Sequence, residues 1–159
     1  MHKMNEPKND SLGNQIVTEA LEWLGTPWFH GQSLKGIGTD CVGFVAGVGI
    51  KVGFLPHDFI LENYERIPRN NFLVRFIEGI LTRVEGNPDK GDVLVFRKNG
   101  INAHVGIYLG DGEYIHADSI NGVIKTYIHE YPPVLIYRAC TNLSRFQSFN
   151  LSKSLNSLK

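Results

Sequence analysis

Three residues of this 159-residue chain could together carry covalent chemistry: one cysteine, Cys41, and two histidines, His104 and His116. Cys41 stands at the expected start of a helix, where the positive end of the helix dipole favours the thiolate form. A thiolate attacks a carbonyl carbon when a neighbouring base takes up and returns the proton. The backbone N–H of Cys41 would then stabilise the resulting oxyanion. A cysteine in an apolar stretch is by itself more often a buried small hydrophobe, so the hypothesis depends on the histidines.

The two histidines occupy neighbouring β-branched runs joined by Gly-Asp-Gly at 110–112. If these three residues form the loop, position 109 pairs with 113, 106 with 116 and 104 with 118. His104 and His116 then project from one face, on a diagonal of roughly 7–8 Å. A two-residue turn at Asp111 and Gly112 would shift the pairing by one and separate the histidines to opposite faces. In the first register His104 is the base facing Cys41, and His116 binds its other ring nitrogen and fixes its tautomer.

The elements that must position these residues are predicted from hydrophobic spacing. A first helix begins after Asp10 or Ser11 and ends at Gly25-Thr26-Pro27, and a loop follows over 28–39. Its apolar face comprises Leu12, Ile16, Val17, Ala20, Leu21 and Leu24. Residues 40–52 fit a strand or a helix by pattern. We favour a closely packed helix because the run is long and contains Gly43, Ala46 and Gly47. Thr39 or Asp40 would cap this helix, and Gly53 would lie just past its end.

The second half of the chain changes character. Helical spacing over 72–81, capped by Asn70 or Asn71, gives way to a turn-rich break at 85–91 and then to short β-branched runs. The predicted strands are 92–97, 104–109, 113–117, 123–128 and 134–138. Helices followed by antiparallel strands predict an α+β fold, with N-terminal helices packed on the sheet. We expect a flexible N-terminus at 1–9, one domain at 10–141 and a polar C-terminal tail at 142–159.

Composition restricts the classes of partner. Lys plus Arg and Asp plus Glu both number 16, which argues against a nucleic-acid binder because such proteins usually carry a basic excess. No apolar run reaches the roughly 20 residues that span a bilayer, so we expect no membrane partner. The polar start lacks the apolar core of a secretory signal. We therefore expect synthesis in the cytoplasm, two free thiols, and Cys140 as a packing residue.

Three separated motifs resemble the NlpC superfamily of cell-wall cysteine peptidases. The segment GTPWFHGQSLKGIGTDCVGF resembles the family's nucleophile region, and its HGQSLKG stretch looks closest to the phage and prophage branch. The segment KGDVLVFRKNGINAHVGIYLGDGEYIHA resembles the family's three following strands. The resemblance covers residues 12–128. It implies a papain-like fold, a Cys-His-His triad at Cys41, His104 and His116, and no cofactor or metal.

The resemblance also implies a substrate. The family typically hydrolyses the bond between γ-D-glutamate and a diamino acid in the peptidoglycan stem peptide. The motif positions expected to contact substrate are Trp28, His30, Asp40 and Val42. Trp28 and Val42 replace a tyrosine and a serine, so neither supplies a hydroxyl for a free amino terminus. Asp40 could meet an ammonium group or simply cap the helix.

Three other interpretations stay open. Cys41, His104 and His116 could be three zinc ligands, although no close ligand pair accompanies them. The chain could be a non-catalytic phage tail or tail-assembly component that binds wall peptide in the same groove, with other tail proteins as partners. The same chemistry could also act on another amide or thioester. Without a secretory signal, a virion tail is the expected route to the cell wall.

Overall fold

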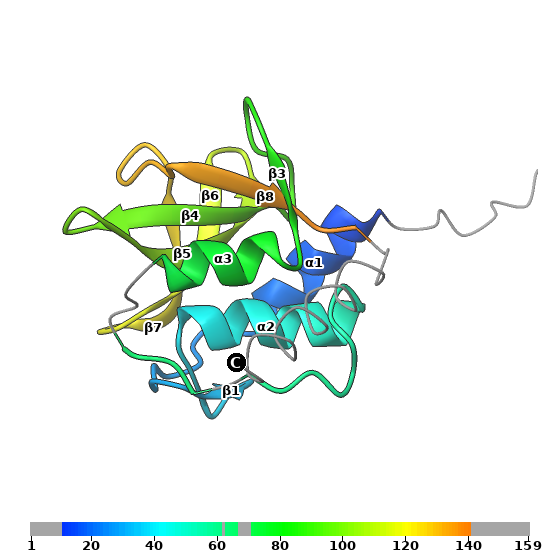
Figure 1. Ribbon diagram of the computed structural model, residues 1–159, viewed down its shortest axis with the longest axis vertical. Helices are drawn as coiled ribbons and strands as arrows, with labels where there is room; N and C mark the ends of the chain where they lie inside the picture. Colours follow the sequence, from blue (N-terminus) through cyan, green and yellow to red (C-terminus); the bar gives the residue numbers. More distant parts are fainter. Residues whose placement is uncertain (1–10, 62, 67–70, 141–159) are drawn as a thin grey trace, which may run out of the picture.

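The computed structural model describes residues 11–61, 63–66 and 71–140. Within them the order is α1 (Leu12–Leu21), β1 (Ser33–Leu34), β2 (Gly38–Thr39), α2 (Cys41–Val52), α3 (Phe72–Glu78), β3 (Thr82–Val84), β4 (Val93–Lys98), β5 (Ile101–Gly110), β6 (Glu113–Asp118), β7 (Gly122–Tyr127) and β8 (Leu135–Arg138). This α+β arrangement is the one expected (Figure 1). The predictions for 1–9, for Asn70 and for 142–159 lie outside the described residues.

Helix α1 begins as predicted but ends earlier than its apolar spacing suggested. The Ser11 hydroxyl accepts from the backbone N–H of Asn14 at 3.2 Å and caps the helix. Leu21 and Leu24, expected on the buried face, are 37% and 43% exposed. The chain turns after Leu21, so the helical spacing no longer holds for the residues that follow. Trp23, which is only 3% exposed, packs against the core instead.

Helix α2 confirms the choice of a helix over a strand for the segment after Asp40. The Asp40 side chain accepts from the N–H of Gly43, and Gly53 ends the helix with φ +96°. A Cβ atom at Gly43 would lie 2.0 Å from the carbonyl oxygen of Gln32. The small residues therefore let α2 pack directly against the preceding segment, which places Cys41 in the first turn.

The structure adds short strands that the sequence did not indicate. Strands β1 and β2 form a hairpin inside the segment predicted as a loop, and β3 pairs with β8 after α3 has ended at Glu78. Runs of two or three residues contain no alternation to detect. Cys140, predicted to pack in the core, is exposed instead, because the chain leaves the sheet after β8.

The large sheet has the antiparallel strand order β3-β8-β4-β5-β6-β7. Ile107 pairs with Ile115 and Tyr108 with Tyr114, which is the register that the three-residue loop predicted. The turn itself is nevertheless the two-residue one, because Gly110 pairs with Glu113. Leu109 is the additional residue on β5, and the resulting bulge restores the register that a two-residue turn would have shifted.

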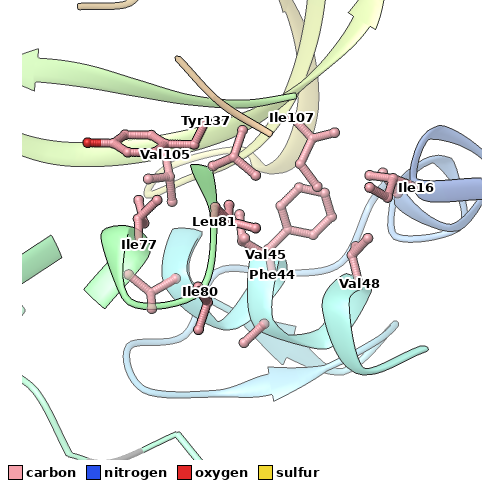
Figure 2. Packing of buried hydrophobic residues seen from close by; sticks show 14 of the residues in the cluster. Ile16, Phe44, Val45, Val48, Ile77, Ile80, Leu81, Val105, Ile107 and Tyr137 are labelled. Atoms are coloured by element: carbon pink, nitrogen blue, oxygen red, sulfur yellow. The ribbon is translucent and has the colours of Figure 1, made fainter. Parts of the chain in front are cut away.

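One face of the sheet packs against all three helices. In Figure 1, α2 (cyan) runs beneath the strands, with β1 on its far side. Figure 2 shows Phe44 and Val48 of α2 on the side of the helix that faces the sheet residue Ile107 and Ile16 of α1. The opposite face carries a smaller cluster around Leu94, Phe96 and Tyr114. Within the described ranges, no helix has the length and apolar character needed to cross a membrane.

Candidate active site

Cys41 and His104 line the same cavity, which has a volume of about 430 Å³. Residue Cys41 is partly exposed at the start of α2 and borders this cavity. His104 lies on β5 and His116 on β6, and both are 7% exposed. Nε2 of His104 lies 2.7 Å from Nδ1 of His116, with the two rings nearly perpendicular. Nδ1 of His104 takes no part in this contact.

Burial keeps both imidazoles neutral. Desolvation lowers the pKa of His104 to about 3, and the charges of His116 and Lys98 act in the same direction. Desolvation also lowers the pKa of His116 to about 4. The pair therefore offers an uncharged base to the cavity across the neutral pH range.

The Cys41 thiol is also neutral. Burial raises its pKa to about 12, and the adjacent Asp40 carboxylate contributes to the increase. Hydrogen bonds from the backbone at Val105 and Val42 act in the opposite direction. The expected stabilisation of a thiolate by the helix start is thus outweighed by desolvation and by Asp40.

The Asp40 carboxylate is 3% exposed and surrounded by donors. Its Oδ1 accepts from the N–H of Gly43 at 2.8 Å, which is the capping bond of α2. Its Oδ2 accepts from the N–H of Gly31 at 2.7 Å and from the Tyr64 hydroxyl, and His30 Nδ1 lies 3.5 Å away. Of its two expected roles, the structure shows the cap. A substrate ammonium would have to compete with these donors for Oδ2.

The other expected substrate contacts, Trp28, His30 and Val42, also line the cavity. The rings of Trp28 and His30 stack with centroids 6.5 Å apart, and His30 Nε2 lies 2.9 Å from the carbonyl oxygen of Tyr64. Val42 is 3% exposed, so it offers the cavity only a small apolar area.

Sequence reasoning missed several residues that border the cavity. Tyr64 and Arg66 come from the irregular segment after α2, and the Arg66 guanidinium lies 4.8 Å from the centre of the Trp28 ring. Lys98, at the end of β4, lies at the same rim. Tyr64 and Arg66 lie outside any regular element, so no local periodicity points to them. Arg66 and Lys98 bring two positive charges to the cavity lining, and Glu65 brings a negative one.

The zinc alternative lacks a ligand group in the described part of the chain. Among residues 11–61, 63–66 and 71–140, no three His, Cys, Asp or Glu side chains are grouped to hold a metal ion. His116 instead uses both ring nitrogens within the protein, since its Nε2 lies 3.0 Å from the Thr126 hydroxyl. Neither ring nitrogen of His116 is therefore left for a metal ion.

Known proteins resemble this chain over most of its length. The chain is 29% identical to the murein DD-endopeptidase MepS/murein LD-carboxypeptidase of Escherichia coli (strain K12), over 79% of this chain and 60% of that protein. It is also 29% identical to the probable endopeptidase NlpC homolog of Haemophilus influenzae, over 81% of this chain and 63% of the relative. The chain thus spans about three fifths of the length of these curated relatives.

Solved structures show the same fold. The NlpC/p60 domain of the peptidoglycan hydrolase SagA matches with a TM-score of 0.59 and 26% identity, covering 79% of this chain and 97% of that domain. NlpC2 from Trichomonas vaginalis matches with a TM-score of 0.63 and 19% identity, covering 89% of this chain and 51% of that chain. The family model of NlpC/P60 matches residues 25–134, which contain Cys41, His104 and His116. The chain therefore belongs to the NlpC/P60 family.

Proposed function

We propose that this protein is a cysteine peptidase that hydrolyses an amide bond in the peptide of bacterial peptidoglycan. The observation that carries the proposal is the joint placement of Cys41 and His104 in one cavity, with His104 held at 2.7 Å by His116. Family membership, the murein endopeptidase name of the Escherichia coli relative and the peptidoglycan hydrolase name of the SagA structure support the substrate class.

The mechanism is acyl transfer through a thioester. The Sγ atom of Cys41 attacks the amide carbonyl carbon while its proton passes to Nδ1 of His104. The backbone N–H of Cys41 is the nearest candidate to stabilise the oxyanion. His104 then protonates the leaving amine, and the C–N bond breaks. A water molecule gives its proton to His104 and cleaves the thioester, which restores the Cys41 thiol.

The scissile bond that we propose joins γ-D-glutamate to the diamino acid of the stem peptide. A γ-linked glutamate keeps its α-carboxylate free, and the Arg66 or Lys98 side chain in the cavity lining suits such a group. Because Asp40 already accepts from Gly31, Gly43 and Tyr64, we propose that a free stem-peptide amino terminus is not required.

We also propose that the protein acts from a phage tail or prophage-derived particle. This proposal rests on the HGQSLKG stretch and its resemblance to the phage branch. The test is an immunoblot for this chain on purified particles induced from the host. Detection of the chain only in cell extract would contradict the particle location but not the peptidase activity.

The decisive experiment compares the wild type with Cys41→Ala on purified peptidoglycan and on defined stem peptides, with products identified by mass spectrometry. We expect the variant to keep its melting temperature and lose all cleavage, while Cys140→Ala, the matched control at the other cysteine, remains active. Chelator treatment should leave the wild type active. Wild type that binds peptidoglycan without cleaving it would instead support the non-catalytic tail component.

A further inference from the structure

The hydrogen-bonded chain that starts at the catalytic base does not end at His116. Nδ1 of His116 lies 2.7 Å from His104 Nε2, and its Nε2 lies 3.0 Å from Oγ1 of Thr126 on β7. Thr126 reaches this position through strand register: it pairs directly with Tyr114, whereas His116 pairs with Ile124. Thr126 is therefore the diagonal neighbour of His116 on the same face of the sheet.

The proton positions in this chain depend on one another. Neutral imidazole has one N–H donor and one bare acceptor nitrogen. For His104 Nδ1 to take the thiol proton, its Nε2 must carry hydrogen and donate to His116. Nδ1 of His116 must then be bare, so its own hydrogen lies on Nε2 and needs an acceptor. The hydroxyl oxygen of Thr126 is placed to be that acceptor.

The opposite assignment would disable the base. If Thr126 donated to His116 Nε2, His116 would carry hydrogen on Nδ1 and donate to His104. His104 would then hold its single hydrogen on Nδ1 and present no lone pair to Cys41. The hydroxyl must therefore direct its own hydrogen elsewhere, and the Tyr114 phenol is its neighbour. Burial raises the pKa of Tyr114 to about 12, while a side-chain hydrogen bond with Thr126 acts to lower it, so the phenol oxygen is within reach of the Thr126 hydroxyl.

The charged groups around His116 do not take the place of Thr126 as the acceptor for the His116 Nε2 hydrogen. Asp118 and Lys98 both act on the two imidazoles, in opposite directions. The Asp118 carboxylate is engaged in its own turn, where Oδ2 accepts from the N–H groups of Ile120 and Asn121. Ring contacts between Tyr114 and His116, with centroids 4.9 Å apart, further restrict the second imidazole.

We propose that Thr126 is a positioning residue of the active site, which acts through His116 to hold His104 in the tautomer that accepts the Cys41 proton. This inference rests on the proposed peptidase activity. It extends the Cys41–His104–His116 arrangement by one hydroxyl on the neighbouring strand. The reaction and its proton balance remain those given above, and Thr126 itself contacts no reacting atom.

The test compares Thr126→Val with Thr126→Ser in the full chain. Valine keeps the β-branched shape but removes the acceptor, whereas serine keeps the hydroxyl. We expect kcat to fall about tenfold to hundredfold in Thr126→Val. This loss is smaller than the ~10⁴-fold loss typical of a histidine fixed in the wrong tautomer. Thr126→Ser should retain most of the activity. The acid limb of the pH profile of kcat should also move to lower pH in Thr126→Val. In this variant the Nε2 hydrogen of His116 has no acceptor, so His116 accepts less well from the His104 imidazolium that forms during attack.

A second measurement does not depend on turnover. In protein labelled with ¹⁵N-histidine, the wild type and Thr126→Ser should show both active-site imidazoles protonated at Nε2, while Thr126→Val should show His116 protonated at Nδ1 in a substantial fraction. Wild-type His116 protonated at Nδ1, or equal kcat losses in the valine and serine variants, would overturn the inference. An inactive wild type with the expected tautomers would count against the proposed function alone.

Discussion

The hydroxyl of Tyr64 donates a hydrogen bond to the carboxylate of Asp40, the residue directly before Cys41. Tyr64 follows α2 by more than ten residues, so this contact joins an irregular segment to the start of the nucleophile helix. Burial raises the pKa of Tyr64, and the Asp40 carboxylate raises it further. The phenol thus stays protonated and occupies the oxygen that a substrate ammonium would otherwise reach.

Tyr64→Phe is therefore expected to change substrate preference. Removing the hydroxyl leaves one acceptor site on Asp40 open, at a cost to stability of about 1 kcal/mol. The ratio of kcat/KM for a stem peptide with a free amino terminus to that for its N-acetylated form should rise. Tyr131→Phe is the matched control, because the Tyr131 hydroxyl donates to the Arg97 carbonyl instead. An unchanged ratio would mean that Asp40 does not meet the amino terminus.

His104→Ala should reduce turnover more than His116→Ala. In the proposed mechanism His104 transfers the proton, whereas His116 orients its ring through the contact at 2.7 Å. Single-turnover kinetics on a defined stem peptide will separate the two effects, with circular dichroism to verify folding. Equal losses would assign His116 a role beyond orientation.

The buried histidines make stability depend on pH. Their native pKa values, about 3 for His104 and about 4 for His116, lie below the ordinary 6.5. Below pH 6.5 the unfolded chain binds protons that the native protein excludes, so stability falls as pH decreases towards 4. Melting temperatures should show this decline, and the double variant His104→Gln, His116→Gln should show a flatter profile. Parallel profiles of melting temperature against pH for the two proteins would mean that groups other than these histidines cause the pH dependence.

Gly43→Ala should destabilise the protein although alanine is the better helix former. A Cβ atom there would lie 2.0 Å from the Gln32 carbonyl oxygen, so the backbone must move. We expect a net loss of about 1–3 kcal/mol in the free energy of unfolding, measured by urea denaturation. Lys51→Ala, on the exposed side of the same helix, should change stability little. A variant as stable as the wild type would show that the backbone at Gln32 can move away from the new Cβ atom at little cost in free energy.

Local sequence patterns were sufficient for much of the fold. Ser11, Asp40 and Gly53 mark helix ends because capping and left-handed backbone are properties of single residues. The β-branched runs indicate β4 to β8 because strand preference also acts locally. By contrast, β1, β2 and β3 are too short to show a hydrophobic alternation in the sequence. They are strands because the segments that they pair with lie beside them in the folded chain.

The sequence by itself determined which side chains could do chemistry, Cys41 and the two histidines, because a nucleophilic sulfur and basic nitrogens belong to the side chains themselves. Tertiary structure decided how they are used. The bulge at Leu109 corrects the register of a two-residue turn, so that His104 and His116 meet. Burial, which only the packed chain creates, sets the pKa values of Cys41 and His104. Tyr64 and Thr126 join the site through contacts between distant segments, and no pattern along the chain encodes such distances.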